Sequence, residues 1–185
     1  MKTGGPASSM QRVMDTADLH LRPLRETDAK ALFAMLADAQ TVRYWSSEPA
    51  TDPEAVRDKH LEDMQSDAQG SSVNWAICKK GSEKMLGKCV LFNLNTRHRR
   101  AEIGFLLDRR YWRRGLMRQA LEAVLGYAFS HLGLHRIEAD VDPANSGSLA
   151  LLEKLGFRRE GLFRDRWFIG GQWKDSVMLG LVKKE

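Results

Sequence analysis

The feature that most constrains this chain is a short apolar run joined by an arginine-rich connector to a long amphipathic segment. Ile103 to Leu107 is continuously apolar, which indicates a buried strand. After Gly115, apolar residues recur with the 3.6-residue period of a helix that buries one face. They are Met117, Ala120, Leu121, Val124, Ala128 and Leu132. The sequence therefore predicts a strand, a basic turn over residues 108–114, and a helix that Gly115 opens.

The turn between this strand and this helix has the chemistry of an oxyanion site. The first N–H groups of a helix have no acceptor inside the helix, and the peptide dipoles place about half a positive charge there. Gly115 lets the backbone approach an anion closely, and the neighbouring arginines add charged donors. We therefore expect this turn to bind phosphate.

Charge and composition are consistent with this expectation. The 185 residues carry a formal net charge of +5, which favours phosphate ligands such as a nucleotide cofactor or RNA. We expect the arginines before and after the strand to gather near the turn, although solvation alone explains any single one equally well. These are Arg97, Arg99, Arg100, Arg109, Arg110, Arg113, Arg114 and Arg118. A hydrophobic content of 43%, without a membrane-length apolar stretch, indicates a soluble globular protein rather than a membrane protein.

The ends of the chain and its cysteines suggest one intracellular domain. Residues 1–18 are expected to form a flexible N-terminal extension, because MKTGGPASS is small and polar and lacks the apolar centre of a secretory signal. Residues 19–185 are expected to form a single domain. Cys78 and Cys89 both lie in apolar stretches, which indicates buried thiols and a cytoplasmic location.

The order of the expected elements defines the fold class. Thr27 or Asp28 is expected to cap a first helix, and Asp52-Pro53-Glu54 to start a second that runs to about Gln65. A fourth helix is expected over 146–155. The expected strands cover 19–24, 73–78, 85–94, 101–107, 137–141, 157–163 and 173–182. Because hairpins come first and strands then alternate with helices, we predict an α/β (α+β) three-layer fold with a mixed sheet and helices on both faces.

Other common sites are not indicated. The five histidines lack metal-ligand spacing with the cysteines or with each other, so we expect no metal site. Neither G-x-x-x-x-G-K-[ST] nor G-x-G-x-x-G occurs.

Four motifs in order resemble the GCN5-related N-acetyltransferases (GNAT), and within them the RimJ/RimL type that acetylates ribosomal-protein N-termini. The similarity covers the chain from Leu19 onward. Each motif is weak alone, but their order and spacing are specific for the family. The motifs are Ala101-Glu102-Ile103-Gly104-Phe105, Tyr111-Trp112-Arg113-Arg114-Gly115-Leu116-Met117, Asn145-Ser146-Gly147-Ser148 and Leu152-Glu153-Lys154-Leu155-Gly156-Phe157.

The resemblance implies acetyl-CoA as cofactor, with its pantetheine arm between two splayed parallel strands, here the one ending at Leu107 and the one over 137–141. It also implies that backbone groups of Leu106 and Leu107 pair with this arm and that Asn145 bonds it, although Asn145 also suits a simple loop cap. The implied diphosphate cradle consists of Arg113, Arg114, Gly115, Leu116, Met117 and Arg118. Met117 departs from the glycine or alanine usual at its position.

The same resemblance suggests the catalytic groups. Glu102 matches the general base of this branch; alternatively it is a strand glutamate paired with Arg100 or with a neighbouring charge. Ser148 matches the general acid toward the leaving thiolate, in place of the tyrosine that Leu152 replaces; alternatively its hydroxyl bonds the helix backbone. An amine attacks the thioester directly, so no covalent nucleophile is required.

Three functions are compatible with these residues. The first is acetylation of a protein N-terminus, such as that of a ribosomal protein, by a monomer or homodimer. The second is acetylation of a small amine, such as an amino acid, a polyamine or an aminoglycoside. The third, a non-catalytic acyl-CoA or RNA binder, is disfavoured because no aromatic platform for RNA is evident. Aromatic residues that form either an acceptor pocket or part of the core are Tyr44, Trp45, Trp167, Phe168 and Trp173.

Overall fold

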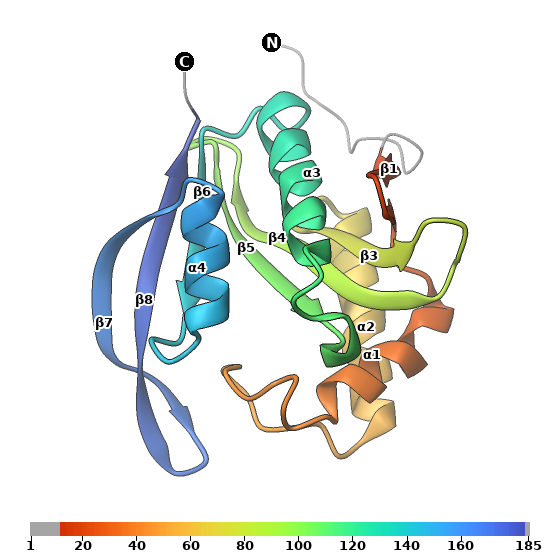
Figure 1. The fold of residues 1–185 in the computed structure, drawn as a ribbon, viewed down its shortest axis with the longest axis horizontal. Helices are drawn as coiled ribbons and strands as arrows, with labels where there is room; N and C mark the ends of the chain where they lie inside the picture. Colours follow the sequence, from red (N-terminus) through yellow and green to blue (C-terminus); the bar gives the residue numbers. More distant parts are fainter. Residues whose placement is uncertain (1–11, 184–185) are drawn as a thin grey trace.

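The computed structural model describes residues 12–183, which are built around an eight-stranded sheet in the order β1-β2-β3-β4-β5-β6-β8-β7 (Figure 1). Neighbouring strands are antiparallel except β5 and β6, which run parallel. The sheet is therefore mixed, as predicted, and mostly antiparallel. The strands are β1 (Met14–Asp15), β2 (Leu19–Arg22), β3 (Val73–Lys79), β4 (Met85–Asn95), β5 (Arg100–Leu107), β6 (Arg136–Val141), β7 (Arg158–Ile169) and β8 (Gln172–Val182).

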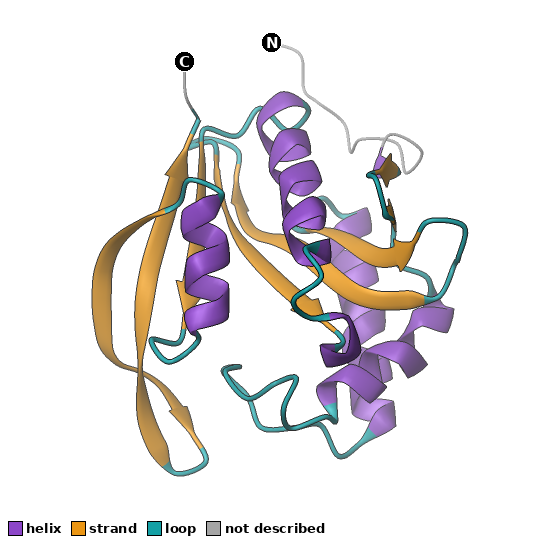
Figure 2. Ribbon diagram, viewed as in Figure 1, coloured by secondary structure: helices purple, strands orange, loops and turns teal. Residues whose placement is uncertain are grey.

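Helices cover both faces of this sheet, which confirms the three-layer arrangement (Figure 2). Two 3₁₀ turns, η2 (Glu26–Asp28) and η3 (Arg109–Tyr111), precede α1 and α3. The helices are α1 (Ala29–Leu36), α2 (Pro53–Ala68), α3 (Leu116–Ser130) and α4 (Ser146–Lys154). The buried faces of α3 and α4 share one core with the sheet, while those of α1 and α2 form a second core on its other side. No helix in the described residues is long and apolar enough to cross a membrane.

Strand β5 contributes to both cores because successive side chains of a strand point to opposite faces. Ala101, Ile103 and Leu107 belong to the core under α3 and α4, whereas Leu106 belongs to the core under α1 and α2. Glu102 lies between two residues of the first core and therefore turns toward the α1 and α2 side.

The parallel strands β5 and β6 stay together for only part of their length. Their pairing covers three residues of each strand, from Arg100 opposite Arg136 to Glu102 opposite Glu138. Beyond Glu102, β5 continues to Leu107 and β6 continues to Val141 without a ladder between them. The two strands thus open into a V, as the family resemblance implied.

Several element boundaries differ from the sequence-based expectation. Met14–Asp15, expected in a flexible extension, pairs with β2, because the carbonyl of Arg12 accepts the Trp75 indole N–H at 3.0 Å and its guanidinium pairs with Asp67. Helix α2 runs to Ala68, past the expected end at Gln65, and so includes Asp67. The rest of the expected extension, residues 1–11, lies outside the described part of the chain.

The last hairpin also extends further than expected. Strand β7 continues to Ile169 instead of ending at Phe163, and it reaches a tight turn at Gly170-Gly171. Both glycines have positive φ, 56° and 75°, which suits the two central residues of a tight hairpin turn.

The expected cap of the first helix is wrong. Asp28 makes no capping bond to α1. Its carboxylate accepts hydrogen bonds from both terminal nitrogens of Arg22, at 2.7 and 2.8 Å, and from the backbone N–H of Arg25. In contrast, Asp52 caps α2 as predicted, by accepting the N–H of Glu54 at 2.9 Å.

The expected burial of the two thiols is confirmed. Cys78 and Cys89 are both free and buried, and burial raises the pKa of each thiol.

Candidate active site

The turn before α3 exposes a run of backbone N–H groups. The N–H of Trp112 donates to Arg109 and that of Gln119 donates to Gly115. Within the described residues, the six amides between them, those of residues 113–118, donate to no protein acceptor. Arg113 and Gly115 both have left-handed backbone, with φ of 59° and 74°, and such alternation turns successive N–H groups toward one point. This arrangement can bind a diphosphate.

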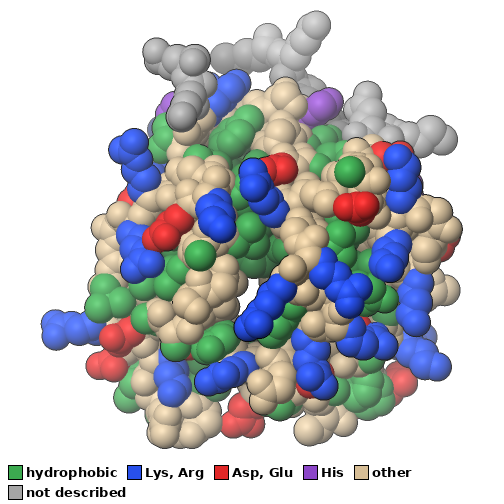
Figure 3. Space-filling model, viewed as in Figure 1, with side chains coloured by type: hydrophobic (Ala, Val, Ile, Leu, Met, Phe, Trp, Pro, Cys, Tyr) green, Lys and Arg blue, Asp and Glu red, His purple; other side chains and the backbone are tan. Residues whose placement is uncertain are grey.

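The arginines near this turn differ in how they are bound. Arg109 pairs with Asp38 at 2.9 Å and Arg118 with Glu122 at 2.8 Å. Arg113 and Arg114 form no ion pair among the described residues; the Arg114 guanidinium lies 5.7 Å from the Tyr111 ring centre. Figure 3 shows Lys and Arg side chains gathered on the face that carries the start of α3. Two exposed arginines are therefore free for an anionic ligand.

Asp108 stabilises the turn through hydrogen bonds from Arg110. It caps η3 by accepting the N–H of Arg110 at 2.9 Å, and its carboxylate also accepts the Arg110 side chain. The side-chain hydrogen bond from Arg110 lowers the pKa of Asp108, so this pair stays ionised at neutral pH.

The expected position of three further arginines is wrong. Arg97 and Arg99 lie in the turn between β4 and β5, and Arg100 begins β5. The extended strand separates Arg100 from Leu107 by roughly 23 Å. Arg99 donates to the carbonyl of Gly133 at 2.7 Å, and Arg100 donates to Glu138 at 2.8 Å. Arg99 and Arg100 therefore stabilise the closed end of the V.

The bulk of Met117 does not obstruct the anion site. Its side chain is buried in the core under α3, where its sulfur lies 4.0 Å from the sulfur of Cys89. Leu116 is buried in the same core. Both residues therefore present only backbone to the turn.

The two leucines at the end of β5 point their backbone groups in opposite directions. Asp108 donates its N–H to Leu86 in β4, and Leu107 lies opposite Gly87. Along an antiparallel ladder, residues whose N–H and C=O groups bond to the neighbouring strand alternate with residues whose groups point away from it. The backbone groups of Leu106 therefore bond to β4, and those of Leu107 face the opening of the V. The carbonyl of Leu107 accepts the Trp112 indole N–H at 2.7 Å. Of the two expected backbone contacts, only Leu107 is therefore directed toward the gap.

Glu102 lies at the closed end of the V, where β5 last pairs with β6. Its side chain is half-buried, and its Oε1 accepts the side-chain N–H of Asn93 at 2.9 Å. The alternative pairing with Arg100 is wrong, because Arg100 donates to Glu138 instead. Glu102 and Leu107 are separated by roughly 17 Å of extended strand, a span comparable to an extended pantetheine arm.

Asn93 was not recognised from the sequence. It lies in a bulge of β4, where the register shifts between Phe92 and Asn95, and its φ is 50°. The only sequence signal was an asparagine inside an apolar strand, since asparagine tolerates left-handed backbone better than most residues. The partner of Asn93, Glu102, is nine residues away and could be found only from the pairing register.

Asn145 and Ser148 meet at the start of α4. Asn145 Oδ1 accepts the N–H of Ser148 at 3.1 Å, which is the capping role considered as an alternative. The amide NH₂ of Asn145 donates to no protein group among the described residues, so it is free for a ligand. Ser148 is half-buried, and Leu152 is fully buried in the core.

The candidate acceptor side carries exposed aromatic residues. Trp45, Phe168 and Trp173 are 38%, 61% and 62% exposed, and Trp167 is 37% exposed, so the alternative that these four belong to the core is wrong. Tyr44 is half-buried. The loop that carries Trp45 and the β7–β8 turn approach each other, since Glu48 would lie 3.5 Å from a Cβ at Gly170.

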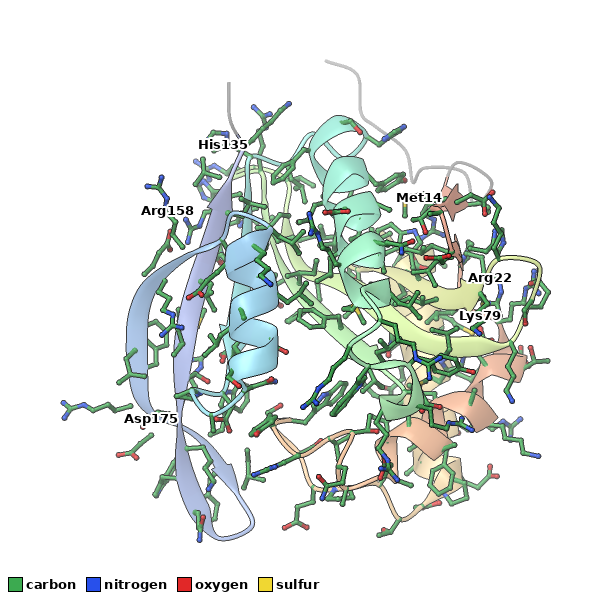
Figure 4. All side chains as sticks on the ribbon, viewed as in Figure 1. Met14, Arg22, Lys79, His135, Arg158 and Asp175 are labelled. Carbon is green, nitrogen blue, oxygen red and sulfur yellow. The ribbon has the colours of Figure 1, made fainter. Side chains whose placement is uncertain are left out.

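A hollow of about 580 Å³ lies between α2 and β4, on the side of the sheet toward which Glu102 points. Figure 4 shows the described side chains as sticks on the ribbon; Lys79, labelled at the end of β3, does not line this hollow. Residues lining the hollow are Lys59, Asp63, Ser66, Ser71, Ser72, Lys88, Val90, Phe92, Asn93 and Leu94. Asn93, the partner of Glu102, therefore stands at the edge of an open space.

Comparison with known proteins agrees with this geometry. Residues 18–158 match the acetyltransferase (GNAT) domain family. The chain is 33% identical over 172 residues to the uncharacterized N-acetyltransferase p20 of Bacillus licheniformis, covering 92% of this chain and 96% of that protein. It is 30% identical over 168 residues to the spermidine N(1)-acetyltransferase of Escherichia coli K12, covering 89% and 86%.

A solved acetyltransferase of the GNAT family from Bacillus anthracis superposes with a TM-score of 0.82 at 26% identity, covering 94% of this chain and 99% of that one. The fold, the V between β5 and β6 and the sequence match agree, and the chain belongs to the GNAT family of acetyl-CoA-dependent N-acetyltransferases.

Proposed function

We propose that this enzyme transfers an acetyl group from acetyl-CoA to the α-amine at a protein N-terminus, by direct attack of the amine. The observation that carries the proposal is the arrangement along β5. Free amides follow the open end of the V, and Glu102 stands at its closed end, separated from Leu107 by roughly 17 Å of extended strand. Bound acetyl-CoA supplies an activated thioester carbonyl.

The binding residues have separate tasks in this proposal. The amides of residues 113–118 hold the diphosphate, with Arg113 and Arg114 adding charge. The N–H of Leu107 and the free amide NH₂ of Asn145 hold the pantetheine arm from the two sides of the V.

Proton transfer is assigned to two side chains. Glu102 accepts the proton of the attacking amine, and Ser148 donates a proton toward the departing sulfur. An α-amine titrates near 8, well below a lysine amine near 10.4, so a single carboxylate is a sufficient base for an N-terminal acceptor.

The aromatic residues on the acceptor side favour a peptide over a polyamine. Two carboxylates, Asp140 and Asp38, are paired with Arg166 and Arg109 and are less available to the positive charges of a polyamine. The exposed aromatic rings of the β7–β8 hairpin offer apolar contact area to a peptide instead. Acetylation of a polyamine is the second candidate, because it is the activity named for the relative from Escherichia coli.

The experiment is release of free thiol from acetyl-CoA by the purified protein, with peptides of varied N-terminal residue, spermidine and an aminoglycoside as acceptors. We expect turnover with peptides to exceed turnover with spermidine, and Glu102→Gln to lower peptide turnover more than tenfold with acetyl-CoA affinity little changed. Preference for spermidine would overturn the acceptor assignment, and an unchanged rate in Glu102→Gln would remove Glu102 from the mechanism.

A further inference from the structure

We propose that Asn93 is a positioning residue for Glu102, delivered by a left-handed bulge in β4; the inference rests on the proposed role of Glu102 as the base. Strands β4 and β5 keep one register from Gly87 opposite Leu107 to Phe92 opposite Glu102. Pairing resumes with Asn95 opposite Arg100, so two residues of β4 face one residue of β5. This is the geometry of a β-bulge.

The bulge changes the face to which residue 93 points. In β4, Cys89 and Leu91 belong to the core under α3, and strict alternation would direct residue 93 to the same core. The left-handed backbone at Asn93, with φ of 50°, breaks the alternation and brings its amide to Glu102. Glycine is the residue that adopts this backbone most easily, so what asparagine adds is its side chain.

A neutral donor suits a base better than a cation does. An arginine would stabilise the carboxylate form and make the group a weaker proton acceptor, whereas an amide N–H fixes its orientation with less charge stabilisation. The cations near Glu102 are held by other acids. Arg100 donates to Glu138 in β6, and Lys59 and Lys88 both bind Asp63.

The surroundings leave this pair rigid but accessible. Gly104 follows Glu102 on the same face of β5, and a Cβ there would lie 3.2 Å from Val90 and 3.5 Å from Phe92. These apolar side chains limit the movement of the carboxylate on one side. Asn93 also lines the open hollow beside α2, so this end of the pair is not sealed inside the core.

Two variants of Asn93 test the inference, using the peptide that gives the fastest turnover. Asn93→Gly keeps the left-handed backbone and removes the amide. We expect kcat to fall about tenfold, with the KM for acetyl-CoA and the melting temperature unchanged. Asn93→Asp keeps the shape but places a second carboxylate about 3 Å from Glu102, so the acid limb of the kcat/KM pH profile should move up by about one pH unit.

Asn95→Asp is the matched control, because it adds the same charge to the same strand at a residue whose side chain accepts the N–H of His98. Its acid limb should stay close to that of the wild type. Wild-type kcat in Asn93→Gly together with an unmoved acid limb in Asn93→Asp overturns the inference. If Glu102→Gln is inactive in that case, Glu102 is still the base and only the positioning role of Asn93 is rejected. If Glu102→Gln is fully active, the positioning role of Asn93 and the base role of Glu102 are both rejected.

Discussion

Two roles are assigned to the side chain of Asn145, and they use different atoms of its amide. Its Oδ1 caps α4 by accepting the N–H of Ser148, while its NH₂ group is free for the pantetheine arm. Asn145→Ala removes both atoms. We expect the loss of the cap to cost about 1 kcal/mol, which for a chain of this size lowers the melting temperature by about 2–4 °C.

Asn145→Asp distinguishes the two roles. The carboxylate still accepts the N–H of Ser148, and its charge lies at the positive end of α4, so stability should equal or slightly exceed that of the wild type. The variant cannot donate to the arm, however. The loss of one hydrogen bond, about 1–1.5 kcal/mol, weakens acetyl-CoA binding about five- to twelvefold.

The assays are calorimetric titration of acetyl-CoA and thermal unfolding followed by circular dichroism. We expect both Asn145 variants to bind acetyl-CoA more weakly, but only Asn145→Ala to melt earlier. Wild-type affinity in Asn145→Asp would show that the residue is only a helix cap, and the contact with the arm would then have to be abandoned.

Two other substitutions probe the scaffold. Gly115→Ala should lower stability by about 1 kcal/mol and weaken acetyl-CoA binding, since alanine disfavours φ of 74° although no atom lies within 4 Å of its Cβ; Gly126→Ala, inside α3, should instead be neutral or stabilising in the same melting and titration experiments. Asp28→Ala should cost about 3 kcal/mol in urea unfolding by leaving the buried Arg22 without its main partner, and a smaller loss in the double variant Arg22→Met/Asp28→Leu would show that the uncompensated charge is the cause.

Local sequence signals predicted much of this fold correctly. The period of α3, the cap and proline that start α2, and the Gly170-Gly171 turn are encoded by residues adjacent in the chain, and each was found where expected. Errors arose where a distant residue decides the outcome. Helix α2 continues past Gln65 because Asp67 binds Arg12, which is 55 residues away.

In the candidate site too, features formed by adjacent residues were predictable from the sequence, and those that depend on distant partners were not. The anion turn was predictable because its residues are consecutive, and the family motifs pointed to Glu102, Asn145 and Ser148. The sequence could not show which backbone groups face the V, because Leu106 and Leu107 differ only in their register against β4. Nor could it show which arginines are free, since that depends on partners such as Asp38 and Glu138.

What the sequence by itself determined is local: the elements, their order and the chemistry of the turn before α3, because periodicity, capping and free helix amides depend on neighbouring residues. What only the tertiary structure decided is pairing. The parting of β5 from β6, and the bulge that brings Asn93 to Glu102, depend on the register between strands. A shift of one residue in that register would reverse every side chain, and no short stretch of sequence specifies it.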